Sequence, residues 1–233
     1  MLTSRLAARA GSVTAIEIDR DLAVGLRQMM PPNVEVVTAD VLEVDLAAYA
    51  AGGTLRVAGN LPYNISSPIL FKLLRAKRGL SPFSDAGKEG SPLFRDATVM
   101  LQREVADRLV AKPGTKDYGV LTIFTAARAD VTRLLTLPPG AFRPAPKVHS
   151  AVVRLTFVHP RVPLELEGTF ERMVRTMFMQ RRKTVGNALR PFAAALGRDG
   201  LSALSAVGID PGARPETLDL AALTRLAGVF GPA

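Results

Sequence analysis

The chain has 233 residues, 48% of them hydrophobic, and no cysteine, so it can bury one or two domain cores but forms neither disulfides nor thiolate metal sites. Its apolar runs are shorter than the ~18 residues of a membrane span and no signal pattern opens it, so we expect a cytoplasmic protein with no membrane partner. Lys and Arg exceed Asp and Glu by 30 − 21 = 9, which favours a polyanionic partner over a merely basic surface, and two histidines are too few for a histidine metal cluster.

Short apolar runs alternate with helical patterns in the first part of the chain. Strands are expected at 13–18, 34–37 and 55–58, and helices at 2–10 and 21–30. After the third strand comes a helix for which Ser67 is the predicted cap and Pro68 the first residue. Strands and helices at this spacing predict βαβ units and a largely parallel sheet.

The run Asn60-Leu61-Pro62-Tyr63 lies on the loop that leaves the third strand, and open α/β sheets bind ligands at such loops. Asn60 can accept a hydrogen bond from an exocyclic amine, and Tyr63 offers a ring face for stacking. Pro62 stiffens the loop and helps to aim the Leu61 carbonyl. The four residues alone fit an ordinary proline turn equally well, but the strand before and the helix after them favour a site for a planar base that bears an amine.

Two acids, Glu17 and Asp40, stand at the ends of the two earlier strands. A carboxylate at Glu17 can accept hydrogen bonds from the vicinal hydroxyls of a ribose, as in dinucleotide-binding folds. Taken alone, Glu17 is equally a surface acid, and Asp40 is equally a helix or turn cap.

From residue 75 to about residue 160 the chain continues with a loop, strands and helices, and after that point the pattern changes. The segment 75–96 is rich in Gly, Pro and charges and predicts a surface loop. Further strands are expected at 97–101, 131–137 and 149–157, and further helices at 103–111 and 118–127. After residue 160 the patterns are purely helical. We therefore predict an α/β catalytic domain at 1–160 and a small helical domain at 161–233.

Five stretches together resemble the rRNA adenine N6-dimethyltransferases. They are Thr14–Asp19, Asn60–Tyr63, Leu101–Leu109, Ala141–Val152 and Gln180–Thr184. Within that family the chain is most similar to bacterial enzymes that dimethylate two adjacent adenosines near the 3′ end of small-subunit (16S) rRNA. The resemblance implies a Rossmann-like methyltransferase sheet, S-adenosyl-L-methionine (AdoMet) as methyl donor without a metal, a 30S pre-ribosomal partner, a role in ribosome biogenesis and a monomeric state.

The resemblance also implies a role for each candidate residue. Glu17 with Ile18, and Asp40 with Val41, match positions that bind the cofactor's ribose and adenine. Asn60 borders both the methionine end of the cofactor and the target amine, as part of a catalytic group completed by Leu61, Pro62 and Tyr63.

The target base and the RNA backbone have their own candidates. Tyr63 is expected to stack on one face of the base and Phe142 on the other, although Phe142 fits core packing as well. Basic residues are candidates for phosphate contacts or, more simply, form a solvated face. They are Arg143, Lys147, Arg181, Arg182 and Lys183.

The front of the chain departs from the family pattern. The family has a first strand and a Gly-rich loop before the residues that match Leu2-Thr3, whereas this chain begins at Met1. We therefore interpret it as an N-terminally truncated member and expect the strands at 13–18 and 55–58 to flank a gap in the sheet, with backbone groups unpaired.

Two other functions compete with small-subunit dimethylation. One is methylation of large-subunit rRNA adenine, of the macrolide-resistance type, against which the stretches Arg181–Thr184 and Gly208–Pro211 argue. The other is a non-catalytic RNA-binding factor in ribosome assembly, which needs the basic face but not the cofactor.

Overall fold

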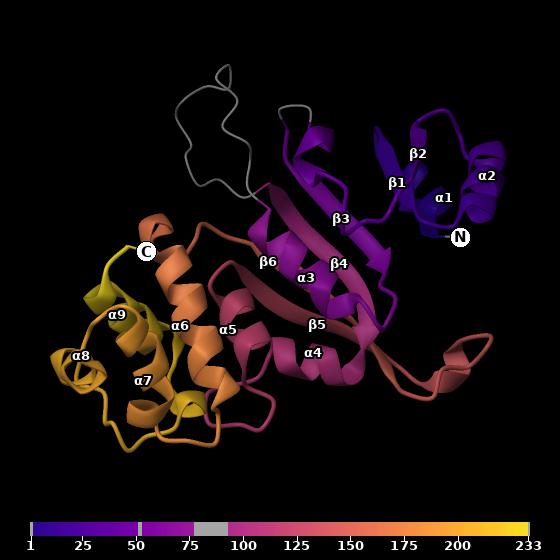
Figure 1. Ribbon diagram of the computed structural model, residues 1–233. Helices are drawn as coiled ribbons and strands as arrows, with labels where there is room; N and C mark the ends of the chain where they lie inside the picture. The colour runs from indigo at the N-terminus through magenta and orange to yellow at the C-terminus, as the bar shows by residue number, and fades with distance from the viewer. Residues whose placement is uncertain (1, 51–52, 77–92, 233) are drawn as a thin grey trace.

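The computed structural model describes residues 2–50, 53–76 and 93–232 (Figure 1). The strands are β1 (Val13–Glu17), β2 (Val34–Thr38), β3 (Leu55–Asn60), β4 (Phe94–Gln102), β5 (Ala129–Leu137) and β6 (Ser150–Phe157). The helices are α1 (Leu2–Ala7), α2 (Arg20–Met29), α3 (Ser66–Arg75), α4 (Arg103–Leu109), α5 (Val120–Ala126), α6 (Glu167–Met179), α7 (Val185–Ala195), α8 (Gly200–Ala206) and α9 (Leu220–Phe230). Most of the loop predicted at 75–96 lies outside the described residues.

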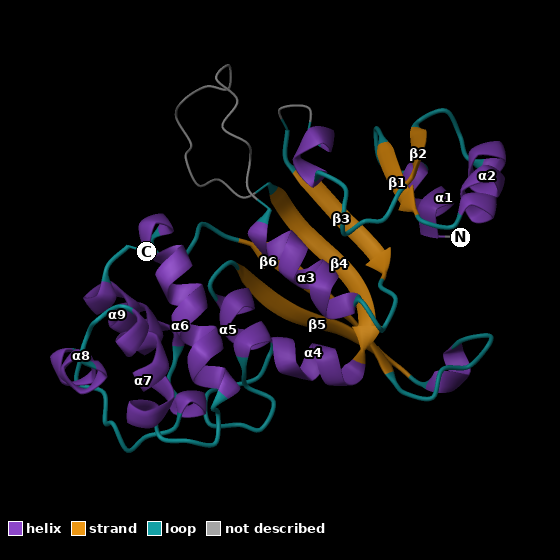
Figure 2. Ribbon diagram, in the orientation of Figure 1, coloured by secondary structure: helices purple, strands orange, loops and turns teal. Residues whose placement is uncertain are grey.

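The strands form two separate sheets (Figure 2). β1 and β2 pair in parallel, and the larger sheet has the order β3-β4-β6-β5. No ladder joins β1 to β3 among the described residues, so the expected gap is present. The prediction of a largely parallel sheet was wrong for the larger one: only β3 and β4 are parallel, because β5 and β6 follow each other through a short connection and pair antiparallel.

The junction between β3 and α3 also differs from the sequence prediction. β3 continues through Asn60 rather than ending at residue 58, since the Leu61 N–H still donates to the Met100 carbonyl of β4 (2.9 Å). α3 begins at Ser66 and has no side-chain cap, so the prediction of Ser67 as its cap was wrong. The Ser66 hydroxyl instead donates to the Tyr63 carbonyl (3.2 Å), which joins the loop directly to the first turn of the helix.

The α/β class and the helical C-terminal part are confirmed. Figure 1 shows α6 to α9 gathered on one side of the larger sheet, with β1, β2, α1 and α2 on the opposite side. One buried apolar cluster runs from β3 and α3 through α5 into α6, α7 and α9. Because this core is continuous, the domain boundary at residue 160 stays a prediction. None of the described helices is both long and apolar enough to cross a membrane.

Candidate active site

The loop after β3 presents two unused hydrogen-bond acceptors. The Asn60 side chain is exposed at the carboxyl end of the strand, and neither it nor the Leu61 carbonyl has a hydrogen-bond partner in the described part of the chain. The backbone around them is fixed by two bonds, from the Leu61 N–H to the Met100 carbonyl and from the Ile65 N–H to the Pro62 carbonyl (3.1 Å). Both acceptors are thus free for a ligand on a loop that cannot easily change shape.

Tyr63 is fixed at its hydroxyl end. The Tyr63 Oη lies 2.5 Å from the Oγ of Ser150, the first residue of β6, and either atom could be the donor. Ser150 is fully buried, whereas the tyrosine as a whole is half-buried. β4 lies between β3 and β6, so the tyrosine side chain reaches across the carboxyl end of β4.

The two acids lie together at the end of the smaller sheet. Glu17 is the register partner of Thr38, and the Ala39 N–H donates to the Glu17 carbonyl (3.1 Å), which brings Asp40 to the same edge. Each carboxylate uses one oxygen locally: Glu17 accepts from the Asp19 N–H (3.0 Å) and Asp40 from the Leu42 N–H (2.8 Å). The second oxygen of each has no partner among the described residues and can accept from a ligand.

A short contact connects these acids to the helix that carries the Asn60 loop. The Lys72 ammonium of α3 donates to the Leu42 carbonyl (2.7 Å), and Val41 and Leu42 pack against the main core. Ile18, in contrast, is exposed with 66% of its surface accessible. The β2 side of the predicted cofactor site is therefore joined to α3, while the β1 side is open.

The structure does not bring Phe142 against Tyr63. Phe142 is half-buried on the connection between β5 and β6, and no contact between its ring and Tyr63 exists among the described aromatic pairs. Arg143 and Lys147 are exposed on the same connection, which projects from the larger sheet (Figure 1). The predicted stacking role of Phe142 therefore requires a ligand, or a movement of this connection, to bring its ring to the Asn60 loop.

The three consecutive basic residues after α6 fall into two groups. Arg181 forms an ion pair with Glu216 and donates to the Thr115 carbonyl (3.0 Å), so it joins the helical part to the loop before α5. Arg182 and Lys183 are exposed and make no side-chain contact within the described residues. Only the latter two are free to meet a phosphate without a bond being broken.

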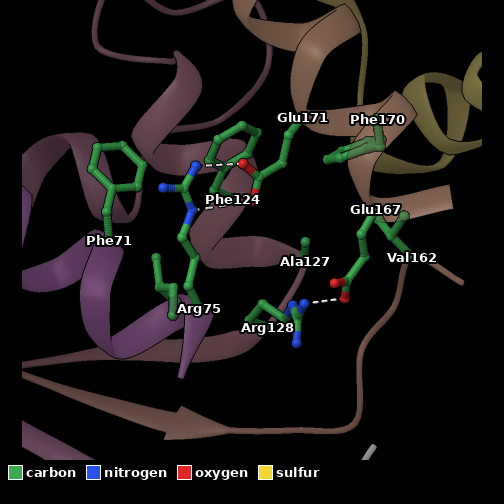
Figure 3. A pocket seen from close by; sticks show the side chains of 10 residues that line it. Phe71, Arg75, Phe124, Ala127, Arg128, Val162, Glu167, Phe170 and Glu171 are labelled. Atoms are coloured by element: carbon green, nitrogen blue, oxygen red, sulfur yellow. Dashed lines mark hydrogen bonds and ion pairs between the residues drawn. The ribbon is translucent and has the colours of Figure 1, made fainter. Parts of the chain in front are cut away.

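A separate pocket lies where α3, α5 and α6 meet (Figure 3). Arg75 pairs there with Glu171, and Arg128 pairs with Glu167. Its lining residues are Phe71, Leu74, Arg75, Phe124, Ala127, Arg128, Val162, Glu167, Phe170 and Glu171. The Asn60 loop precedes the start of α3, whereas Arg75 ends it, roughly 15 Å away at 1.5 Å per helical residue. The pocket is therefore a seam between packed helices and lies apart from the candidate site.

Ser150 and Lys72 are the polar contacts of this region that sequence reasoning missed. Ser150 stands within the stretch 141–152 that carries the family resemblance, but a single serine in a strand signals nothing by itself. Lys72 sits on a helix face that mixes apolar and basic residues, and only its partner, a backbone carbonyl, gives it a role.

Comparisons with known proteins identify the family that this chain resembles. The family model described as ribosomal RNA adenine dimethylase matches residues 1–225. A relative from Acidithiobacillus ferrooxidans, named ribosomal RNA small subunit methyltransferase A, is 45% identical over 229 residues, which cover 97% of this chain and 78% of the relative. A protein of the same name from Geobacter metallireducens is 44% identical over 242 residues, which cover 99% of this chain and 82% of the relative.

Two solved structures are similar in fold. A dimethyladenosine transferase from Plasmodium falciparum has a TM-score of 0.72 at 23% identity, covering 97% of this chain and 84% of that one. The 23S rRNA methyltransferase ErmE has a TM-score of 0.67 at 29% identity, covering 98% and 85%. Both matches extend over the sheets as well as the C-terminal helices.

Proposed function

The chain belongs to the ribosomal RNA adenine dimethylase family, and we propose that it transfers methyl groups from AdoMet to N6 of two adjacent adenosines near the 3′ end of small-subunit rRNA. One observation carries the proposal: the Asn60 side chain and the Leu61 carbonyl are free, adjacent acceptors on a fixed loop beside Tyr63. Relatives named for the small subunit are up to 45% identical, against 29% for the large-subunit enzyme ErmE, which favours the small subunit.

The free acceptors suit the difficulty of this reaction. AdoMet, when bound, supplies a methyl group on a positively charged sulfur that leaves as a neutral thioether. The N6 lone pair of adenine is delocalised into the ring, so N6 is a poor nucleophile. Hydrogen bonds from the two N6 hydrogens to the Asn60 oxygen and the Leu61 carbonyl favour a pyramidal amine and direct its lone pair at the methyl carbon. No side-chain base is needed, because the proton becomes acidic only after the transfer and can leave to water.

The same arrangement permits a second transfer. N6-methyladenine keeps one N6 hydrogen, which can still donate a hydrogen bond to the Asn60 oxygen or to the Leu61 carbonyl. The lone pair of N6 is then directed at the methyl group of a second AdoMet molecule. Tyr63 contributes the stacking surface that keeps the purine plane fixed in both rounds. Phe142 is proposed for the opposite face, which requires the β5–β6 connection to approach the base.

The chemistry of the acids at the smaller sheet fits AdoMet. The unused oxygen of Glu17 can accept from a ribose hydroxyl, and that of Asp40 from the adenine amine, with Ile18 and Val41 as their apolar neighbours. Asn60 completes the set from the larger sheet. The fold and this set of hydrogen-bond acceptors together support this cofactor.

The proposed partner is the 30S pre-ribosomal subunit, met by a monomer in the cytoplasm. The target base leaves its stack to reach the Asn60 loop, while cations outside the loop contact phosphates. We assign that role to Arg143, Lys147, Arg182 and Lys183, and to Arg181 only if its ion pair with Glu216 opens. In this proposal residues 161–233 form the rRNA-binding helical domain.

Mapping methylated nucleotides tests the proposal. The purified chain, AdoMet and unmethylated small ribosomal subunits should yield N6-dimethyladenosine at two adjacent positions of small-subunit rRNA. Marks confined to large-subunit rRNA would assign it to the macrolide-resistance type. Tight RNA binding without any methylation or any heat of AdoMet binding would instead support the non-catalytic assembly factor.

A further inference from the structure

The hydrogen bond between Tyr63 and Ser150 connects the candidate active site to the interior of the sheet. Ser150 is 0% exposed, and its register partner in β4 is Gln102, the last residue of that strand. Within the described residues the Oγ of Ser150 has no other side-chain partner than the Tyr63 Oη, at 2.5 Å. A buried hydroxyl that bonds only to one side chain costs free energy unless that side chain stays in place.

The position of Ser150 determines where the tyrosine ring can lie. β3 and β6 are separated by β4, so their chains are about 10 Å apart at the usual strand spacing. Tyr63 bridges that distance with its side chain, while its carbonyl accepts from the Ser66 hydroxyl of α3. The ring is therefore held at both ends, by α3 at the backbone and by β6 at the hydroxyl.

Holding both ends matters because a tyrosine ring is otherwise free to tilt. The χ1 torsion of tyrosine has three staggered wells, so the backbone alone does not fix the direction in which the ring points. The neighbouring acceptors, Asn60 and Leu61, lie on backbone that is hydrogen-bonded to β4 at the end of β3. A base stacked on a tilting ring would move relative to these acceptors and lose its near-attack geometry.

We propose that Ser150 is a positioning residue for adenine-N6 methylation, which fixes the direction of the long axis of the Tyr63 ring through the hydrogen bond between their hydroxyls. The inference rests on the proposed function. It concerns the rate of transfer rather than RNA affinity, because the phosphate contacts come from other residues.

The test compares Ser150→Ala, Tyr63→Phe and the double variant in steady-state methylation of small-subunit RNA. Each single variant removes one hydroxyl of the pair, and we expect kcat to fall about five- to tenfold, as for the loss of one hydrogen bond. KM for RNA should stay within about twofold, since phosphate contacts dominate RNA affinity. The double variant should be no slower than either single one, because both remove the same bond. Ser150→Thr, which keeps the hydroxyl, should restore most of kcat.

A matched control separates positioning from stability. Thr169→Val also removes a buried hydroxyl, one that donates to the Gly231 carbonyl (2.7 Å) in the helical part. It should lower the melting temperature and leave kcat unchanged. If Ser150→Ala does not fold, Tyr63→Phe removes the same bond at the half-buried side, and a wild-type kcat in that variant would overturn the proposal.

Ring dynamics give a readout that needs no activity. The chain has only three tyrosines, so the ring signals of Tyr63 can be assigned by NMR with labelled tyrosine. We expect the Hα–Hβ couplings of Tyr63 to show a single χ1 rotamer in the wild type and averaging over rotamers in Ser150→Ala. Unchanged couplings would overturn the proposal, whereas changed couplings in a chain that methylates no RNA would refute the proposed function alone.

Discussion

The buried hydroxyl of Tyr118 donates a hydrogen bond to the carbonyl of Leu218, 2.8 Å away and 100 residues further along the chain. Beside it, the Gly114 N–H donates to the Glu216 carbonyl (2.7 Å), and the Glu216 side chain pairs with Arg181. These bonds join the loop before α5 to the segment before α9. The α/β part and the helical part are therefore fastened by polar contacts as well as by their shared apolar core.

Tyr118→Phe should destabilise the protein by about 1–3 kcal/mol. The substitution keeps the ring, which is 4% exposed and packs near Phe178, but leaves the Leu218 carbonyl without its donor. Urea unfolding followed by circular dichroism measures the change. Tyr49→Phe is the matched control, because the half-buried Tyr49 makes no side-chain hydrogen bond among the described residues, and its loss should stay below about 0.5 kcal/mol. Equal midpoints for the two variants would contradict a fastening role.

The same hydroxyl should titrate late and weaken the fold at high pH. Burial, and secondly the Asp219 carboxylate, raise the pKa of Tyr118 from 10.0 to about 12. The folded state thus holds this proton more tightly than the unfolded state, so the contribution to stability is complete below pH 10 and disappears as pH rises through 12. The absorbance at 295 nm, subtracted between wild type and Tyr118→Phe, should show one ionisation centred near pH 12. A difference curve centred near pH 10 would show that the hydroxyl is open to water.

Periodicity was sufficient to find the elements but not to fix how they meet. The alternation of apolar runs and amphipathic helices placed β1, β2, β3 and α3 near their observed bounds. It could not show that β6 runs antiparallel to both of its neighbours, β4 and β5, because strand direction depends on the path of the connections. It also misplaced the start of α3: Ser67-Pro68 has the form of a capped helix start, yet the bonds of the Ile65 N–H and the Ser66 hydroxyl extend the helix backward.

The candidate site likewise contains residues that the sequence pattern could predict and contacts that it could not. Asn60, Glu17 and Asp40 could be predicted because each stands at or just after the end of a strand, and strand ends are where α/β sheets bind ligands. Ser150 could not, since its contact with Tyr63 spans 87 residues of sequence and arises only when β6 is placed beside β4. The ion pair between Arg181 and Glu216 could not be predicted either, because a run of basic residues gives no sign of which member has an acidic neighbour.

Asn60→Ala should abolish most methylation while RNA binding persists. The substitution removes one of the two acceptors for N6–H, and losing one such preorganised group lowers kcat by about 100- to 1,000-fold in enzymes of comparable design. The Asn60 side chain makes no hydrogen bond within the described chain, so the melting temperature should not change.

Asn64→Ala is the control for Asn60→Ala, since Asn64 is an exposed asparagine on the same loop without a described side-chain partner. Single-turnover rates and filter binding measure transfer and RNA affinity separately. Near-normal transfer by Asn60→Ala, or a loss of RNA binding equal to its loss of rate, would contradict the assigned role.

The last prediction separates the neighbouring cations after α6. Removing Arg182 and Lys183 together should reduce the slope of log K against log salt by about 1.4 to 1.8, because each lost phosphate contact accounts for about 0.7 to 0.9. Stability should be unchanged, since both side chains are exposed and free. Arg181→Ala should do the reverse: it should lower the melting temperature, because Glu216 and the Thr115 carbonyl lose their partner, with less effect on the slope.

The double variant of Arg5 and Arg9 to alanine is the charge-matched control for that comparison. It removes the same two positive charges from exposed positions in or just after α1, on the far side of the sheet from the C-terminal helices (Figure 1). If phosphates bind at Arg182 and Lys183, the control should retain the wild-type salt slope. An equal fall in both double variants would mean that RNA responds to net charge alone, because a local phosphate contact depends on where the charges lie.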